Sequence, residues 1–245
     1  MDPKYNERYR QLFEKHWWWR ARTELIVRTL ASLRPAQGWK NILDIGCGDA
    51  LFFSCLSQFG EVEGVEPCAG LVSNNGRYRS QIHVCPFDEK FLPGKKYSLI
   101  LLLDVLEHLE NPAQALQHAL SLLAENGTVL ATVPAFLSLW TNHDVLNHHF
   151  TRYTKSSFSK VATEAGMQIR LAHYLYHWTF PAKWAARIIE QTFPQEPEPP
   201  RIPSRWMNQA LYLMTRLEQR TLSRLPMPFG SSLLVVGKKA EALAA

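Results

Sequence analysis

The sequence predicts an α/β protein whose mostly parallel sheet is covered by helices on both faces. Short apolar segments recur between residues 41 and 134, and several are apolar throughout, as strands buried on both sides usually are. The stretches between them are long enough for crossover helices. A chain of 245 residues with 46% hydrophobic residues can bury the core that such a sheet requires.

The N-terminal half contains a helix followed by five strands. Residues 17–34 place apolar side chains at helical spacing, and Pro35 stops the helix because proline cannot continue one. Residues 112–124 predict a crossover helix with Pro112 in its first turn. The five strands are expected at 41–46, 61–67, 81–85, 97–104 and 127–134.

The amino-acid composition changes after the fifth strand. Residues 135–153 read as a loop dense in aromatic residues and histidines. The next helix is expected over 154–165, from Thr154 as its N-cap to Gly166 as its stop. A sixth strand is expected at 167–175.

A long insert separates this strand from the last one, which is expected at 231–239. The insert, residues 176–230, contains an aromatic segment at 176–193, a proline-rich break at 194–203 and an amphipathic helix near 204–225. Such helices could lie on an anionic bilayer, roof a long apolar substrate, or pack against the sheet or a second subunit.

Charge and cysteine content limit the class of protein. The net charge is +5, but residues 151–245 hold thirteen Lys and Arg against six Asp and Glu, a local net charge of +7 that favours an anionic partner. The four cysteines form no CxxC pair, which argues against zinc fingers and a disulfide framework. Without a signal peptide or an apolar run of eighteen residues, we expect a cytoplasmic protein, able to lie peripherally at the inner face of the membrane.

The stretch HWWWRAR at residues 16–22 has three competing interpretations. Consecutive tryptophans fan around a helix, so no single buried face can hold all three. They could stack nucleic acid, sit at a membrane interface, or form a lid over a binding pocket.

The segment LDIGCGDA at 43–50 carries the most chemical information. Gly46 and Gly48 follow a strand, and we expect a helix to start there, so that a ligand can approach the backbone and meet free N–H groups. A dinucleotide fingerprint would need a third glycine, and Asp49 would repel a pyrophosphate. An NAD-dependent oxidoreductase is therefore disfavoured, whereas a cofactor without phosphate fits.

Three features in order resemble the class I S-adenosylmethionine-dependent methyltransferases: DIGCG at 44–48, Glu66 at the end of the second strand, and DVLEHLENP at 104–112. The resemblance implies a Rossmann-like, seven-stranded, mostly parallel sheet. It further implies three parts: an N-terminal helical cap at 1–37, a methyltransferase domain at 38–175 plus 231–239, and the helical insert at 176–230.

The resemblance also implies a site for S-adenosylmethionine. Glu66 would accept the ribose hydroxyls, Asp104 would lie near the methionine portion, and Phe87 or Asp88 near the adenine. In this fold the N-terminal helix crosses the pocket, so Arg22 could meet the carboxylate of the cofactor. The expected cofactor-binding residues are Asp44, Gly46, Cys47, Gly48, Glu66, Phe87, Asp88, Asp104 and Arg22.

Motifs of base methylation are missing, so nucleic acid is not the expected partner: the fourth strand runs into DVLE rather than a [DN]PP[FYW] stretch. DVLEH also resembles ubiquinone-type O-methyltransferases, in which this stretch lies near the acceptor or a metal. Asp104, Glu107 and His108 could be metal ligands. We prefer the alternative that Glu107 and His108 cap the helix beginning near Pro112, and expect no metal.

The acceptor site is expected in the loop NHDVLNHHFTRYT, because ligands of open α/β sheets bind at the carboxyl edge. His143 is the preferred base, with Asp144 and His108 as further catalytic candidates. Acceptor contacts are expected from Trp18, Trp140, His148, Arg152 and Tyr153.

HWWWRAR, the histidine-rich loop and the terminal LPMPFGSSLLVVGKK are similar to bacterial methyltransferases of uncharacterised acceptor, often grouped with envelope-precursor chemistry. The resemblance implies a small-molecule, sugar or lipid-linked acceptor, methylated at oxygen, and membrane contact through residues 176–193. The alternatives are a protein that binds S-adenosylmethionine without catalysis and a membrane-recruited scaffold.

Overall fold

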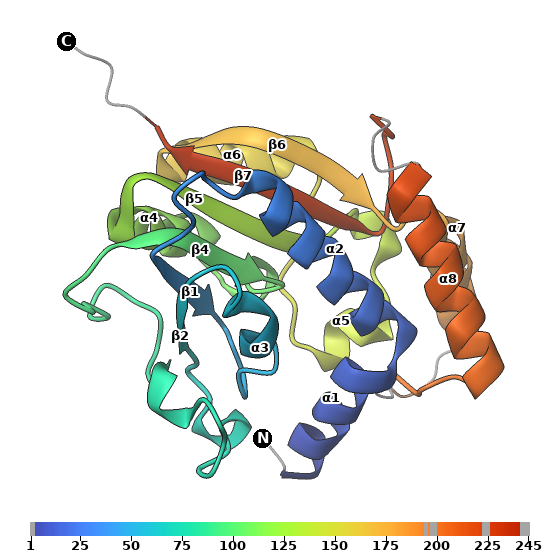
Figure 1. Ribbon diagram of the computed structural model, residues 1–245. Coiled ribbons are helices and arrows are strands. Elements are labelled where there is room, and N and C mark those ends of the chain that lie inside the picture. The colour runs from blue at the N-terminus through green and yellow to red at the C-terminus, as the bar shows by residue number, and fades with distance from the viewer. Residues whose placement is uncertain (1–2, 194–195, 197–199, 222–225, 241–245) are drawn as a thin grey trace.

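A seven-stranded sheet forms the centre of the molecule (Figure 1). The computed structural model describes residues 3–193, 196, 200–221 and 226–240. The strands lie in the order β3-β2-β1-β4-β5-β7-β6, with β7 antiparallel to both of its neighbours and the other pairs from β3 to β5 parallel. Their bounds are β1 Asn41–Ile45, β2 Glu61–Val65, β3 Ile82–His83, β4 Tyr97–Leu103, β5 Leu123–Pro134, β6 Met167–Leu175 and β7 Ser232–Lys239. The Rossmann-like, mostly parallel sheet of the prediction is confirmed.

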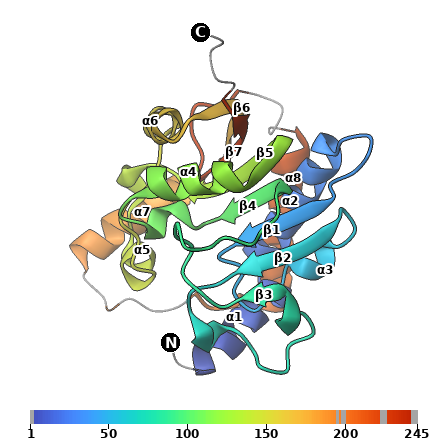
Figure 2. The ribbon, with the colours of Figure 1, turned by 90° about the vertical axis from the view of Figure 1, so that its left-hand side faces the viewer.

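Helices cover both faces of this sheet (Figure 2). Leu116 of α4 and Phe158 of α6 are fully buried on one face, and Ile26 of α2 and Phe53 of α3 on the other. α8 packs along α2 (Figure 1). The helices are α1 Pro3–Lys15, α2 Trp17–Leu33, α3 Phe53–Leu56, α4 Pro112–Leu122, α5 Asn142–Leu146, α6 Lys155–Ala165, α7 Thr179–Thr192 and α8 Arg205–Thr221. The helical N-terminal cap is therefore present as α1 and α2.

Capping residues explain where two of the helices begin and end. α6 starts after Thr154, whose hydroxyl accepts the N–H of Ser157, and it ends at Gly166 in the left-handed conformation (φ 77°). Pro112 occupies the first turn of α4, and the Asn111 side chain accepts the N–H of Gln114. Both helices begin where the sequence predicts, and α6 also ends there.

Several elements differ from the prediction. The third strand is only two residues long, and the helix expected directly at Gly48 is replaced by turns that lead to the four-residue α3. β5 begins at Leu123, in the segment assigned to the end of a helix, because it pairs there with Tyr97 of β4. The expected loop 135–153 contains α5. The start of β5 is set by a tertiary contact, whereas α5 begins with a local capping box between Thr141 and Asp144.

HWWWRAR begins α2, with His16 as its N-cap accepting the N–H of Trp18. The tryptophans diverge: the ring of Trp17 lies 5.4 Å from that of Trp178, Trp18 lies against Tyr176, and Trp19 lies against Tyr9 of α1. All three are half-buried. Each ring therefore has a different neighbour, on α1 or in the insert.

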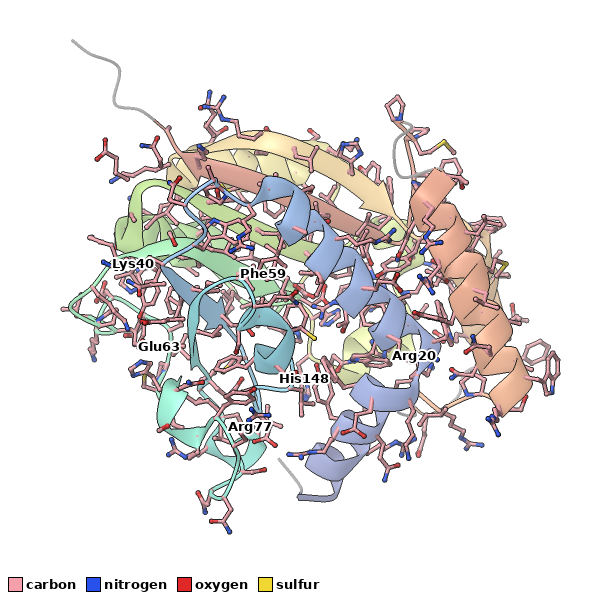
Figure 3. All side chains as sticks on the ribbon, viewed as in Figure 1. Arg20, Lys40, Phe59, Glu63, Arg77 and His148 are labelled. Atoms are coloured by element: carbon pink, nitrogen blue, oxygen red, sulfur yellow. The ribbon has the colours of Figure 1, made fainter. Side chains whose placement is uncertain are left out.

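α8 is held on α2 mainly by polar contacts. Glu24 accepts a hydrogen bond from Tyr212 and pairs with Arg216. Arg20, labelled in Figure 3, has its guanidinium 4.0 Å from the centre of the Tyr212 ring. Both α7 and α8 leave large apolar side chains exposed, among them Trp184 and Trp206. Among the described helices, none has both the length and the apolar character to cross a membrane.

Candidate functional site

Three parallel strands end together and bring the main candidate residues to one edge. Ile45 of β1 pairs with Val65 of β2 and Leu102 of β4, so Gly46, Glu66 and Asp104 follow at neighbouring strand ends. Gly46 has a φ of 73°, and a Cβ atom there would lie 2.8 Å from a methyl group of Val105. Only glycine fits this turn.

Glu66 closes the glycine loop from the second strand. Its carboxylate accepts the N–H groups of Gly48 at 3.0 Å and Cys68 at 2.8 Å. Burial raises the pKa of Glu66 and raises that of Asp44 to about 7. Each oxygen of Glu66 accepts one bond here and has capacity for another, which a pair of hydroxyl groups can use. Cys47 packs its thiol against Gly64 instead of facing a ligand.

Asp104 lies in a left-handed conformation (φ 59°), which non-glycine residues adopt rarely and mostly at functional positions. Arg22, reaching down from α2, pairs with its carboxylate at 2.5 Å, and Thr132 donates a hydrogen bond to it at 3.0 Å. The structure therefore places Arg22 beside Asp104. The Nε atom of Arg22 is buried without a protein partner among the described residues.

α1 lies over the glycine loop. Arg10 forms an ion pair with Asp49, whose carboxylate also accepts the N–H and hydroxyl of Ser73. Tyr9 and Leu12 contribute to the cavity described below. These contacts had no signal in the sequence beyond the charges themselves.

A cavity of about 210 Å³ opens between this edge, α2 and the histidine-rich loop. Gly46 and Asp104 line it from the sheet, Trp18 and Arg22 from α2, and His143 from α5. Further lining residues include Trp19, Leu103, Glu107, His108, His149 and Lys183. The structure thus brings the predicted base to the same cavity as Gly46, Asp104 and Arg22. The other predicted cofactor residues of the glycine loop and the second strand do not line it: Asp44, Cys47, Gly48 and Glu66.

Phe87 and Asp88 are not part of this cavity. They line a separate one of about 600 Å³ beside α4, where the Phe87 ring lies 5.0 Å from that of His118. The structure does not bring them together with Gly46 and Asp104. Their adenine contact stays a prediction.

His143 has the properties of a base. Solvent reaches its ring, but the surrounding protein and the nearby Lys183 disfavour the charged form and lower its pKa to about 4. At pH 7 the imidazole is neutral and can accept a proton. The Asn147 amide nitrogen lies 3.3 Å from the ring nitrogens.

Asp144 is a structural residue, which corrects its expected catalytic role. Its carboxylate is fully buried and receives hydrogen bonds from the backbone of Thr141, from His149 Nδ1 and from two nitrogens of Arg152, each at 2.8 Å. These partners hold the pKa of Asp144 well below its usual range. The carboxylate has neither access to the cavity nor spare capacity for a substrate.

The expected acceptor contacts of this loop are corrected as well. Arg152 is 4% exposed and committed to Asp144. Tyr153 is 2% exposed and donates its hydroxyl to the Leu106 carbonyl. His148 and Trp140 are more accessible, but neither lines the cavity. Trp18 does line it, as expected.

Glu107 is the most informative residue that sequence reasoning undervalued. Its carboxyl group is 1% exposed, and neither oxygen has a hydrogen-bond partner in the described structure. Burial and the neighbouring Asp104 raise its pKa well above the usual range. The expected capping role is wrong, because Asn111 caps α4.

Glu107, His108 and His149 together could hold a divalent cation, since their ligand atoms lie within 4.8 Å of one another. Asp144 binds His149 at Nδ1 and leaves Nε2 available, an arrangement common for metal-binding histidines. Asp104, which the sequence offered as a possible third ligand, pairs with Arg22 instead. The orphaned carboxyl group of Glu107 fits the need of a cation.

Known proteins are similar to this chain. A family model described as methyltransferase domain matches residues 13–172. A mitochondrial ubiquinone biosynthesis O-methyltransferase of Arabidopsis thaliana is 34% identical over 113 residues, 42% of this chain and 35% of that protein. The corresponding enzyme of Bradyrhizobium diazoefficiens is 28% identical over 44% of each chain. The chain therefore spans less than half the length of these two relatives.

Among solved structures, N-methyltransferase NodS of Bradyrhizobium japonicum, in complex with S-adenosyl-L-homocysteine, has a TM-score of 0.54. It is 14% identical and covers 94% of this chain and 91% of its own. At this identity the likeness concerns the fold. The family model covers well over half of the chain, so the chain belongs to the methyltransferase domain family. Its fold is that of the class I S-adenosylmethionine-dependent methyltransferases.

Proposed function

We propose that this protein transfers a methyl group from S-adenosylmethionine to a hydroxyl oxygen of a small-molecule, sugar or lipid-linked acceptor. One observation carries the proposal: a neutral His143 faces the same cavity as Gly46 and Asp104. A hydroxyl acceptor must lose a proton during methyl transfer, and a neutral imidazole can take it. The relatives named as ubiquinone biosynthesis O-methyltransferases support an oxygen acceptor.

In the proposed reaction the acceptor oxygen displaces the methyl group in line, which yields a methyl ether and S-adenosylhomocysteine. Glu66 and the Gly46 turn hold the nucleoside, and the Arg22–Asp104 pair orients the amino-acid portion. His143 receives the hydroxyl proton. Alignment by these groups supplies most of the rate enhancement, because displacement from a sulfonium requires little other assistance.

A divalent cation fits this scheme. Glu107, His108 and His149 would hold it, and it would lower the pKa of an acceptor hydroxyl in the cavity. His108 would then serve as a ligand rather than as a catalytic base. Burial and the nearby His149 already lower the pKa of His108, which favours the neutral form that binds metals.

The direct test uses His143→Gln with a radiolabelled methyl donor and cell extract as the source of acceptor. We expect turnover to fall about 10²–10⁴-fold while affinity for S-adenosylhomocysteine, measured by calorimetry, changes less than about twofold. The control is Leu137→Ala, because Leu137 is exposed and does not line a cavity that contains His143. Unchanged turnover of His143→Gln would remove the base assignment.

A protein that binds the cofactor without catalysis is the main alternative. It predicts S-adenosylhomocysteine binding with no labelled product from any extract. An NAD-dependent oxidoreductase predicts NAD binding instead, and calorimetry with both ligands distinguishes the two.

We further propose that the 1–37 cap and the 176–230 insert serve acceptor binding, with peripheral contact to the inner face of the membrane through 176–193. Exposed Trp184, Ile188 and Ile189 on α7 support this, as does the net positive charge of the C-terminal part. In flotation with vesicles containing phosphatidylglycerol, the protein should rise with the lipid, and Trp184→Ser should reduce that. If the protein remains in the lipid-free fractions at the bottom of the gradient, the proposed membrane contact is contradicted.

A further inference from the structure

A second cavity adjoins the first. Its volume is about 680 Å³, and it shares Trp18, Trp19, His143 and Lys183 with the smaller one. We call it the tryptophan groove, after the four tryptophans in its wall: Trp17, Trp18, Trp19 and Trp178. Because the two cavities share wall residues, a molecule with one end beside His143 can extend its other end along the groove.

The part of the groove walled by the tryptophans and by two alanines of α7 suits a flat or chain-like apolar group. Trp17 and Trp178 form part of its wall with rings 5.4 Å apart and tilted by 40°. On α7, Ala182 and Ala186 face it from successive turns, and their small side chains leave the groove open. Aromatic walls of this kind favour an apolar ligand because they remove its surface from water.

Lys183 stands where the two cavities meet. No carboxylate lies within ion-pairing distance of its ammonium group among the described residues. Two other cations near it have partners: Arg22 pairs with Asp104, and Arg152 pairs with Asp144. Glu190 and Glu196 also line the groove, and Glu190 accepts the N–H of Asn142. Burial and repulsion from Arg152 lower the pKa of Lys183 to about 8, so at pH 7 most of it remains charged.

We propose that Lys183 and the tryptophan groove select an amphiphilic acceptor, with an anionic oxygen group paired to Lys183 beside the methylated hydroxyl and an apolar tail along the groove. The proposal rests on the proposed methyl transfer and narrows its acceptor class. A partly buried ammonium without a counter-charge favours an anion, because pairing restores the interactions lost from water. The cavity position of Lys183 places that anion within the reach of His143.

The test measures binding without turnover, in the presence of S-adenosylhomocysteine at pH 7. The probes are 11-bromoundecanoate and 11-bromoundecan-1-ol, used below their aggregation limits. Bromine quenches tryptophan fluorescence on contact, so quenching reports the tail in the groove. We expect the acid to bind about tenfold more tightly than the alcohol, as for a hydrogen bond to a charged group.

Three variants assign the binding to its parts. Lys183→Met, which keeps length and helix propensity, should abolish the preference for the acid, and Lys183→Arg should retain it. Ala186→Leu should fill the groove and weaken both probes by at least about fivefold. Arg187 is a cation on the same helix but lines neither cavity, so Arg187→Met should leave the affinities for both probes unchanged.

Equal binding of acid and alcohol to the wild-type protein would overturn the role of Lys183. Equal quenching in wild type and Ala186→Leu would overturn the role of the groove. Neither result affects the proposed methyl transfer, which instead fails if the protein does not bind S-adenosylhomocysteine or if no extract yields labelled product.

Discussion

Replacing Asp144 by asparagine tests whether its carboxylate has a structural or a catalytic role. Asp144→Asn keeps the shape of the side chain but removes the charge that Arg152 faces in a site where both side chains are at most 1% exposed. Removing one partner of a buried pair costs about 3–5 kcal/mol. Proteins of this size lose roughly 2–4 °C in Tm per kcal/mol, so we expect Tm to fall by about 6–20 °C.

The assay is thermal and urea unfolding followed by circular dichroism. Glu164→Gln, the same carboxylate-to-amide change on the exposed surface of α6, should shift stability by no more than about 0.5 kcal/mol. Adding Arg152→Met to Asp144→Asn should recover part of the loss, because no buried charge is then left alone.

The pH dependence of this variant has a defined sign. The folded state lowers the pKa of Asp144 below the 3.8 of a solvated aspartate, so the carboxylate stabilises the fold above about pH 4. As pH falls below that value, the difference in stability between wild type and variant should narrow. A variant that unfolds like wild type at pH 7 yet has lost turnover would refute the reasoning and return Asp144 to catalysis.

The remaining predictions concern the cofactor site, the base and the metal. Glu66→Gln should weaken S-adenosylhomocysteine binding at least about tenfold, since hydrogen bonds to a charged group are lost; calorimetry within twofold of wild type would contradict this. Arg22→Ala should also weaken that binding about tenfold by freeing Asp104 from its partner, and unaltered affinity would leave Arg22 a packing residue. Because the pKa of His143 is lowered to about 4, the acidic limb of kcat/KM should lie near pH 4, and a limb near 6.5 would exclude it as the base. Chelation should lower wild-type turnover and leave a Glu107→Gln variant unaffected; no effect on either would exclude the cation.

Local physical chemistry made much of the fold predictable. The stop at Pro35, the Thr154 cap and the left-handed Gly166 each follow from the backbone preferences of one or two residues, and the structure has them in place. The buried central strands were equally clear, because strands covered on both faces are apolar throughout. The two-residue β3 and the short α3 were missed, since their extent depends on neighbours distant in sequence.

The residues of the candidate site also fall into two groups, those with a local sequence signal and those without one. DIGCG and Glu66 were found because a glycine turn and a carboxylate at a strand end leave a local signal. By contrast, Lys183 is one charge within the aromatic segment 176–193, and His149 is one of several histidines in the loop NHDVLNHHFTRYT, so neither has a distinctive local signal. Their importance comes from neighbours on other elements: Lys183 meets His143 in one cavity, and His149 lies with Glu107.

The sequence by itself determined the glycine turn, the start of α4, both ends of α6 and the apolar central strands, because these depend on interactions within a few residues. The motifs along the chain pointed to the family of the fold. Only the tertiary structure decided that Asp144 holds Arg152 and does not reach the cavity, that Arg22 pairs with Asp104, and that the tryptophans of HWWWRAR line a groove. Such partners are 8 to about 160 residues apart, and their meeting depends on how whole elements pack. A side chain's chemistry is set by that packing, through burial and through the charges it faces.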